Sequence, residues 1–229
     1  MRLAIALRSA GRRLGLNRIL MSFVGVRSYE DRFNEALLCG IRPGDIVWDV
    51  GANVGLYTRI FAGIVGSAGK VFAFEPSPEN HARLAANVAK IPGVILLAFG
   101  LGAKEERVPL KQGADSLGAT SQVWGAAPSA DLRDSVAIRV ADTLVREGIS
   151  EAPHFVKIDV EGFELEVLTG MREILRMPRL RGLGVEVHFG LLAERGMHDA
   201  PQQIEALLKR AGFACSWPDN SHLIARRGA

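Results

Sequence analysis

Polar residues that can do acid–base chemistry alternate along two apolar runs in the second half of the chain. Lys157, Asp159 and Glu161 stand two apart in the first run, and Glu186 and His188 end the second. A strand has a period of two, so each set would lie on one side of its strand. Charged groups in buried strands are costly unless they are paired or used, so both strand ends are candidate reactive sites.

Each of these residues has a predicted role in proton transfer or substrate binding. His188 is the best general-base candidate, because imidazole has a reference pKa of about 6.5 and takes a proton near neutral pH. Asp159 is the second candidate, and Lys157 could keep it ionised. Glu161 and Glu186 are candidate substrate-binding groups, although Glu161 could instead cap the helix that follows it.

A ligand-binding loop is predicted earlier in the chain. An apolar run breaks at Asp49, Gly51, Asn53 and Gly55 follow at alternate positions, and an apolar-periodic segment comes next. This order indicates a strand, a tight loop and a helix, and nucleotide-like ligands bind at such units. The loop lacks the Gly-x-Gly-x-x-Gly pattern of dinucleotide folds, which argues against a bound diphosphate.

An acidic residue completes the predicted cofactor site. Glu75 ends a second buried run, 20 residues after Gly55, where a carboxylate can accept hydrogen bonds from both ribose hydroxyls. The two features together describe an adenosine site without a diphosphate. S-adenosylmethionine is a cofactor of that description.

The elements that must position these residues alternate between strand and helix. Ser77 is the expected N-cap of a helix that continues to about Lys90. The run 93–99 is continuously apolar, which is typical of a strand covered on both faces. This alternation predicts an α/β fold with a parallel, doubly wound sheet. Further elements are expected at 136–140 (strand), 155–160 (strand), after Gly162 through Leu175 (helix), 182–188 (strand), 201–210 (helix) and 213–225 (hairpin).

The N-terminal segment differs from the rest. Residues 1–28 hold six arginines and no acid, with apolar residues at helical spacing. Attachment to an anionic membrane surface and a solvated helix that caps the domain are both possible, and Gly11 and Gly15 favour the second. We therefore divide the chain into a basic segment, 1–30, and one domain, 31–229.

The overall composition restricts the partners and the location. A net charge of +3 gives no reason to expect nucleic acid, and the apolar runs are too short for a membrane span or a signal peptide. Two cysteines far apart fit a cytoplasmic protein. The oligomeric state cannot be read from the sequence.

The segment 111–135 is rich in small residues, and Trp124 in it is either part of a surface excursion or an acceptor contact in a lid.

The chain resembles the FkbM family of methyltransferases from about Asp31 to its C-terminus. Three segments carry the resemblance, and the third, with Glu186-Val187-His188 downstream, is the most specific. They are Asp49-Val50-Gly51-Ala52-Asn53-Val54-Gly55, Phe74-Glu75-Pro76 and Lys157-Ile158-Asp159-Val160-Glu161-Gly162-Phe163-Glu164.

This resemblance implies a Rossmann-like sheet of seven strands with an antiparallel last strand. It also implies S-adenosylmethionine as cofactor and methyl transfer to a hydroxyl of a sugar, polyketide or similar metabolite. The loop with Asp49, Gly51, Asn53 and Gly55 would surround the methionine end, and Glu75 the ribose. The segment 99–103 departs from the family pattern, which leaves the adenine contacts open.

Two other functions compete with this interpretation. A nicotinamide-dependent reductase would also use the strand, loop, helix and Glu75, but the chain lacks that class's glycine loop and a Tyr-x-x-x-Lys pair. A cofactor-binding module without catalysis would leave the polar strand ends unexplained.

A divalent metal on the strand-end carboxylates and His188 is a variant of the main hypothesis. The chain lacks, directly after its fifth predicted strand, the adjacent Asp-Asn pair of some magnesium-dependent O-methyltransferases, so we assign no metal ligand.

Overall fold

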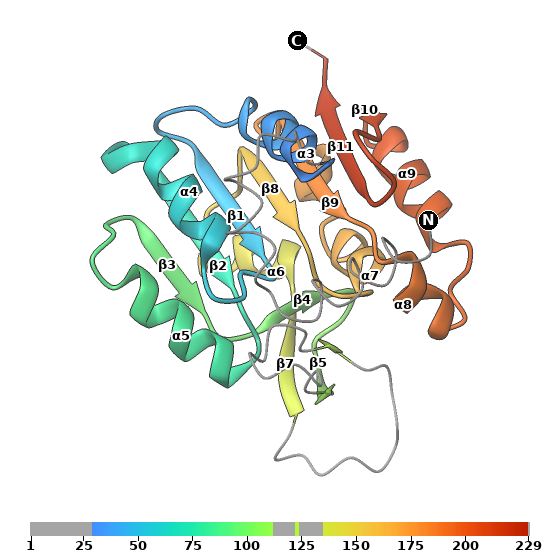
Figure 1. Ribbon diagram of the computed structural model, residues 1–229, viewed down its shortest axis with the longest axis horizontal. Coiled ribbons are helices and arrows are strands. Elements are labelled where there is room, and N and C mark those ends of the chain that lie inside the picture. Colours follow the sequence, from blue (N-terminus) through green and yellow to red (C-terminus); the bar gives the residue numbers. More distant parts are fainter. Residues whose placement is uncertain (1–28, 112–121, 124–134, 229) are drawn as a thin grey trace, which may run out of the picture.

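A computed structural model describes residues 29–111, 122–123 and 135–228 (Figure 1). Seven of the described strands form one sheet, in which all run parallel except the last strand in the chain. In sheet order they are β10 (Phe213–Ser216), β11 (His222–Arg227), β9 (Gly182–Glu186), β8 (Phe155–Ile158), β1 (Ile46–Val50), β2 (Lys70–Phe74) and β3 (Val94–Leu97). The expected seven-stranded, mostly parallel sheet is confirmed.

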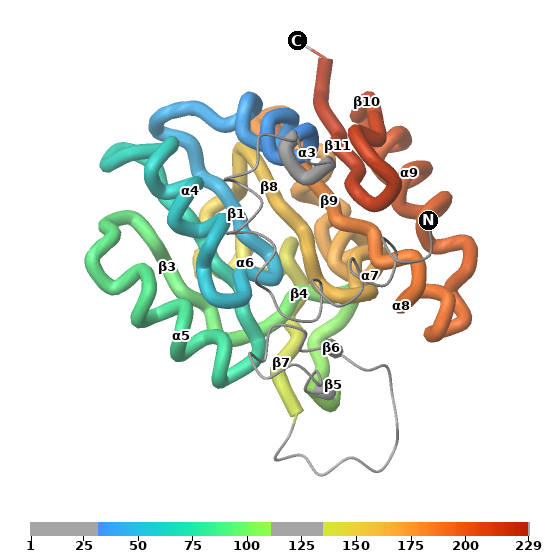
Figure 2. Tube along the Cα trace, viewed as in Figure 1, coloured from blue at the N-terminus to red at the C-terminus, as the bar shows by residue number. Residues whose placement is uncertain are grey.

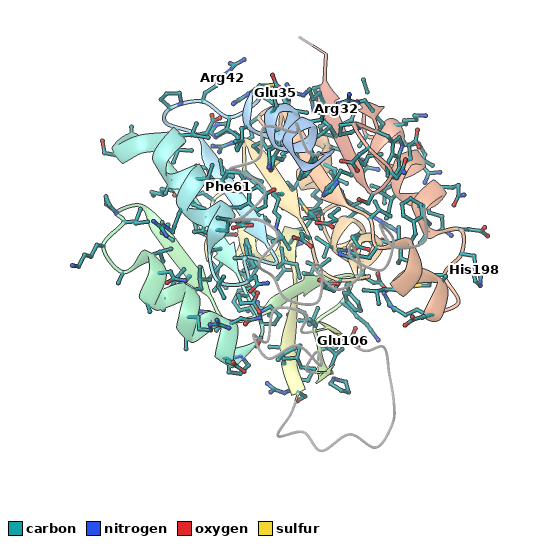
Figure 3. The ribbon with its side chains drawn as sticks, viewed as in Figure 1. Arg32, Glu35, Arg42, Phe61, Glu106 and His198 are labelled. Carbon is teal, nitrogen blue, oxygen red and sulfur yellow. The ribbon has the colours of Figure 1, made fainter. Side chains whose placement is uncertain are left out.

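Helices cover both faces of this sheet. On one face, apolar side chains of α3 (Tyr29–Leu38), α4 (Leu56–Val65) and α5 (Pro78–Val88) pack on β1, β2 and β8. Phe61 of α4 is fully buried there, whereas Arg42 and Glu35 lie at the molecular surface (Figure 3). On the other face lie α6 (Ala141–Arg146), α7 (Glu164–Thr169) and α9 (Ala200–Arg210). The core therefore forms two layers, one on each side of the sheet.

The carboxyl ends of the central strands meet at one edge of the sheet. Val50, the last residue of β1, lies opposite Phe74 of β2 on one side and Ile158 of β8 on the other. The direction of sheet growth changes at β1, and ligands of doubly wound folds bind at such switch points. Residues that directly follow β1, β2 and β8 are thus brought together.

The strand 93–99 differs from its prediction. β3 ends at Leu97 and is half-buried, and in the described part of the chain it is the edge of the sheet rather than a strand covered on both faces. An apolar run shows that a strand can be buried but not where in a sheet it lies. Figure 2 shows β3 and α5 (green) at one edge and β10 with α9 (red) at the other.

A second, smaller sheet was not expected. Its order is β4-β7-β5-β6, with β7 near the predicted strand 136–140. The bounds are β4 (Gly100–Gly102), β5 (Glu106–Lys111), β6 (Gln122–Val123) and β7 (Ser135–Val140). Trp124 lies outside the described residues, as does the segment 1–28.

The helix predicted after Gly162 is interrupted. It splits into α7, whose C-cap is Gly170, and the 3₁₀ helix η4 (Ile174–Arg176). A Cβ on Gly170 would meet the carbonyl oxygen of Gly102 at 2.0 Å, and Asp142 accepts the backbone N–H groups of Glu173 and Ile174. The remaining short helices are η2 (Gly66–Ala68) and α8 (Phe189–Glu194). In the described part of the chain, no helix has the length and apolar character needed to cross a bilayer.

Candidate active site

The loop after β1 is held tightly between the neighbouring strands. Gly51 has a φ of 78°, and a Cβ there would lie 1.8 Å from the carbonyl oxygen of Asp159. The N–H groups of Gly51 and Ala52 both donate to the carbonyl oxygen of Phe74. Only glycine meets these demands, and Gly51 also lines the cavity described below.

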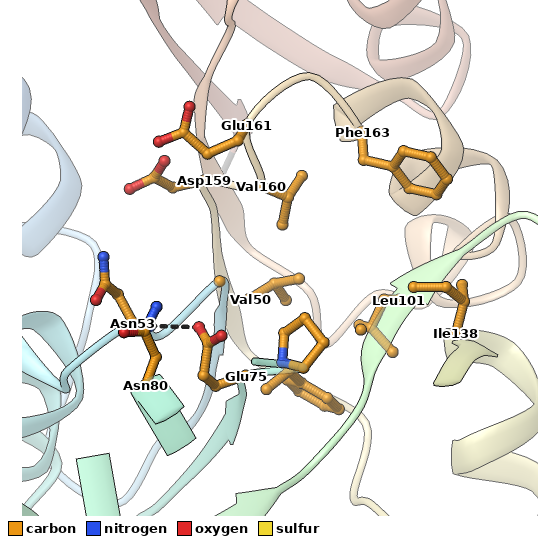
Figure 4. A pocket seen from close by; sticks show the side chains of 14 residues that line it. Val50, Asn53, Glu75, Asn80, Leu101, Ile138, Asp159, Val160, Glu161 and Phe163 are labelled. Carbon is orange, nitrogen blue, oxygen red and sulfur yellow. Dashed lines mark hydrogen bonds between the residues drawn. The ribbon is translucent and has the colours of Figure 1, made fainter. Parts of the chain in front are cut away.

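Glu75 fixes this loop from the end of β2. Its Oε2 accepts the backbone N–H of Asn53 at 2.8 Å, and its Oε1 accepts that of Ser77 at 2.9 Å (Figure 4). Burial raises the pKa of Glu75, and the two hydrogen bonds oppose this rise. Asn53 itself has a φ of 51°, a conformation that non-glycine residues seldom adopt. Each carboxylate oxygen keeps a further lone pair for a ligand.

A cavity extends from this loop across the edge of the sheet. It holds about 630 Å³ of empty space, open solvent at its mouth included. Glu75 and Asn53 lie at one side, Asp159 and Glu161 at another, and Leu101, Ile138 and Phe163 form an apolar wall (Figure 4). The full lining is Val50, Gly51, Asn53, Phe74, Glu75, Pro76, Asn80, Gly100, Leu101, Ile138, Asp159, Val160, Glu161 and Phe163.

Lys157 is a buried cation beneath the loop. Its Nζ lies 3.1 Å from Asp159 Oδ2 and 3.5 Å from Asp49 Oδ1, and it donates to the carbonyl oxygen of Gly51. Burial lowers the pKa of Lys157, but the two carboxylates outweigh it and raise the pKa above its ordinary value. Lys157 therefore remains charged between the two carboxylates.

Asp49 and Gly55 are predicted cofactor ligands that do not line the cavity. Asp49 is fully buried and accepts a hydrogen bond from Thr58 Oγ1 at 2.6 Å. Gly55 is the N-cap of α4 with a φ of 89°, and a Cβ there would collide with Leu84. Both residues therefore fix the conformation of the loop and do not face the cavity.

The polar groups that follow β8 and β9 converge around His188. Its Nε2 lies 3.4 Å from Glu161 Oε2, 3.8 Å from Asp159 Oδ1 and 3.9 Å from Glu186 Oε1. Its Nδ1 lies 2.8 Å from Oε1 of Glu164, whose side chain is fully buried. We call Asp159, Glu161, Glu186 and His188 the strand-end cluster. The sequence-predicted residues of the two strand ends are thus brought together.

The electrostatics of His188 differ from the expectation. Burial lowers the pKa of this imidazole, but the hydrogen bond to Glu164 and the neighbouring carboxylates raise it to about 10. The near-neutral pKa on which its role as a general base relied is therefore not found in this pocket. In the free protein the ring holds its proton at neutral pH.

Glu161 stands in a left-handed turn rather than on a strand. β8 ends at Ile158, and Glu161 has a φ of 52°, a conformation that costs about 1–3 kcal/mol for a non-glycine residue. Burial raises the pKa of Glu161 to about 7, opposed by the charge of His188. Strained backbone of this kind is concentrated at functional sites.

Some contributors to the site were not predicted. His222, at the start of β11, is Glu186's partner in the sheet register, and its Nε2 lies 3.4 Å from Glu186 Oε2. Its Nδ1 lies 2.8 Å from Asp219 Oδ1. Burial lowers the pKa of His222, but Glu186 and Asp219 outweigh this effect and raise it. The register between a hairpin and the neighbouring strand cannot be predicted from local sequence, so no pattern near His222 indicated this contact.

Comparisons with known proteins agree with this arrangement. The family model described as the methyltransferase FkbM domain matches residues 49–215. The chain is 34% identical over 190 residues to the hexuronic acid methyltransferase AglP of Haloferax volcanii, covering 80% of this chain and 71% of that protein. It is 28% identical over 202 residues to the 31-O-demethyl-FK506 methyltransferase FkbM of Streptomyces tacrolimicus, covering 76% and 74%.

Solved structures show the same fold. Aeropyrum pernix fibrillarin, crystallised with natively bound S-adenosyl-L-methionine, matches with a TM-score of 0.52 at 12% identity, over 85% of this chain and 74% of that one. A nicotinamide-dependent oxidoreductase and a non-catalytic module are not favoured by these findings. The chain belongs to the FkbM methyltransferase family and is one of the S-adenosylmethionine-dependent O-methyltransferases that its motifs predicted.

Proposed function

We propose that this enzyme methylates a hydroxyl oxygen of a sugar or polyketide-like metabolite. The observation that carries the proposal is the strand-end cluster at the edge of the cofactor cavity, where Asp159 and Glu161 line the wall. The named relatives act on a hexuronic acid and on a demethylated FK506, which supports a hydroxylated acceptor of this class.

The cavity fits S-adenosylmethionine, which supplies a methyl group on an electrophilic sulfonium. Gly51 and Asn53 line the cavity, where they would contact the methionine end, and the remaining lone pairs of Glu75 suit the ribose hydroxyls. The apolar wall of Leu101 and Ile138 suits adenine, so we propose that these residues contact the base. Asp49 and Gly55 would act indirectly, by fixing the loop.

The residues of the strand-end cluster would position and deprotonate the acceptor. Asp159, which Lys157 would help to keep ionised, would accept a hydrogen bond from the hydroxyl and hold its oxygen toward the cavity. As the new O–C bond forms and the S–C bond breaks, the hydroxyl proton would pass to a carboxylate of this cluster. His188 would organise Glu161 and Asp159 around the acceptor, while Glu186 would contact it from β9.

Three further proposals concern the rest of the chain. The basic segment 1–30 precedes the catalytic domain, 31–229, and would act as its solvated cap rather than as a membrane contact. Trp124 would contact the acceptor. The enzyme would work in the cytoplasm on a small molecule rather than on nucleic acid.

A methyl-transfer screen tests the proposed function. The full chain would be incubated with S-adenosylmethionine carrying a labelled methyl group and with glycosides, hydroxylated polyketides or lipid-linked sugars. Glu161→Gln should lower turnover of a positive acceptor by about 10²–10⁴-fold, and its S-adenosylhomocysteine affinity should stay unchanged. Glu173→Gln, an exposed change outside the cavity, is the control. Normal turnover in Glu161→Gln would show that the strand-end cluster does not take part in the reaction as proposed.

A further inference from the structure

Three residues of the strand-end cluster are arranged as metal ligands. One ligand atom from each of Asp159, Glu161 and His188 lies within 4.8 Å of the other two. The Nε2 atom of His188 is 3.4 Å from Glu161 Oε2 and 3.8 Å from Asp159 Oδ1. Metal–ligand bonds of about 2.1 Å imply ligand spacings of roughly 3.0–3.4 Å, so small side-chain movements would complete the site. We propose that these three residues bind a divalent cation.

Glu164, which has no role of its own in the proposed mechanism, already orients His188 as a metal ligand would be oriented. Oε1 of Glu164 lies 2.8 Å from His188 Nδ1 and also accepts the N–H of Gly162 at 2.8 Å. A carboxylate that accepts from the Nδ1–H group fixes the orientation of the ring, and a cation at Nε2 would displace the proton that this nitrogen holds in the free protein. The second oxygen of Glu164 is buried without a hydrogen-bond partner among the described residues.

The backbone after β8 is folded to bring the two carboxylates to the same imidazole. Glu161 and Gly162 have φ values of 52° and 92°, which reverse the chain between Asp159 and Glu164. A Cβ on Gly162 would lie 2.9 Å from the Cβ of Leu191, so this residue must be glycine for the turn to pack. The strained conformation of Glu161 is maintained by its surroundings and places its carboxylate near His188 Nε2.

The charge balance also favours a cation. Four carboxyl groups surround His188, while Lys157 is already shared by Asp159 and Asp49, and His222 pairs only with Glu186 among these four. Buried carboxylates are stable when they are paired or bind metal. Asp159 and Glu161 line the cavity (Figure 4), so the cation would keep open positions on the side from which an acceptor oxygen arrives.

The ligand types narrow the choice of cation. Two carboxylate oxygens and one imidazole nitrogen suit first-row divalent ions such as Mn²⁺, whereas Ca²⁺ takes six to eight oxygen ligands. Such an ion would hold the acceptor oxygen and lower the pKa of its hydroxyl. Only this catalytic use rests on the proposed function, because cation binding can be measured without any acceptor.

Calorimetric titration of the full chain with Mn²⁺, after chelator treatment and without cofactor, tests the proposal. We expect one Mn²⁺ per chain. Binding should be lost in Glu161→Gln and in His188→Gln, and Glu164→Gln should weaken it about 10–100-fold through the orientation of His188. Glu173→Gln should bind as the parent does. S-adenosylhomocysteine binding, measured in every variant, confirms that each chain is folded.

Two outcomes would overturn the cation site. One is the absence of binding by Mn²⁺, Zn²⁺ and Mg²⁺ in a parent chain that binds S-adenosylhomocysteine. The other is Mn²⁺ affinity that is unchanged in both Glu161→Gln and His188→Gln. Methyl transfer that persists undiminished in EDTA would refute the catalytic use of the cation and leave the proposed O-methylation intact. A parent chain that binds Mn²⁺ but transfers no methyl group to any acceptor tested would refute the proposed function instead.

Discussion

Replacing Glu75 by glutamine separates the two tasks of this carboxylate. Both of its oxygens accept backbone N–H groups, from Asn53 and Ser77, and the side chain is 5% exposed. Glutamine has one acceptor oxygen, and its NH₂ group would face the other N–H group. One buried donor thus loses its partner, which should lower the free energy of unfolding by about 1–3 kcal/mol.

The same change should weaken cofactor binding. A charged acceptor of ribose hydroxyls is replaced by a neutral group, and charge-assisted hydrogen bonds contribute about 1.5–3 kcal/mol. This loss corresponds to a decrease in S-adenosylhomocysteine affinity of roughly 10–150-fold. Nicotinamide cofactors should not bind with comparable affinity to either protein.

Calorimetry and urea denaturation of the same preparations measure the two effects. Glu79→Gln is the matched control, because Glu79 is exposed in the first turn of α5, shortly after Glu75. The control should change neither quantity appreciably. A Glu75→Gln chain that is less stable but binds S-adenosylhomocysteine like the parent would show that Glu75 only fixes the loop, and the ribose assignment would be wrong.

Three other substitutions test the surroundings of the site. Gly51→Ala should abolish S-adenosylhomocysteine binding in calorimetry, because its Cβ would lie 1.8 Å from the carbonyl oxygen of Asp159; intact affinity would contradict the close packing. Lys157→Met leaves the carboxyl group of Asp49 buried without its cation, so urea denaturation should show a loss of roughly 3–5 kcal/mol, and a stable variant would contradict the pairing. Burial lowers the pKa of His154 in the folded protein below its ordinary value of 6.5. The neutral imidazole therefore stabilises the fold above pH 6.5, and this contribution is lost as the pH falls through the folded pKa. The decrease in unfolding free energy from about pH 7.5 to 5.5 should therefore be smaller in His154→Ala, and an identical decrease would refute this linkage.

Local sequence was sufficient for the parts of the site that follow directly from strand and loop chemistry. Gly51 and Glu75 end buried runs at positions where only a few residue types fit, so their place at the sheet edge could be predicted. The convergence of Asp159 and His188 was also predictable, because neighbouring parallel strands end at the same edge.

Other features depend on packing between distant segments. The left-handed turn at Glu161 replaces the expected strand because the chain must pass Leu191, and no local pattern shows that contact. The apolar wall needs a second sheet, whose strands are short and far apart in the chain. The raised pKa of His188 arises from several carboxylates on different elements, so a residue type alone could not give it.

The central position of β1 has a consequence for how the enzyme assembles. Lys157 and Gly51 are 106 residues apart in the chain, yet they form one wall of the site across the β1–β8 pair. Contacts of such high sequence separation form late in folding, because the entropy of closing the loop must be overcome first. A nascent chain with only β1 to β3 paired would have the glycine loop without the Asp159 carbonyl against which it packs. Ligand at about 100 times its dissociation constant stabilises the native state by roughly 2.7 kcal/mol. The cellular supply of S-adenosylmethionine would therefore act selectively on chains whose two halves have already joined.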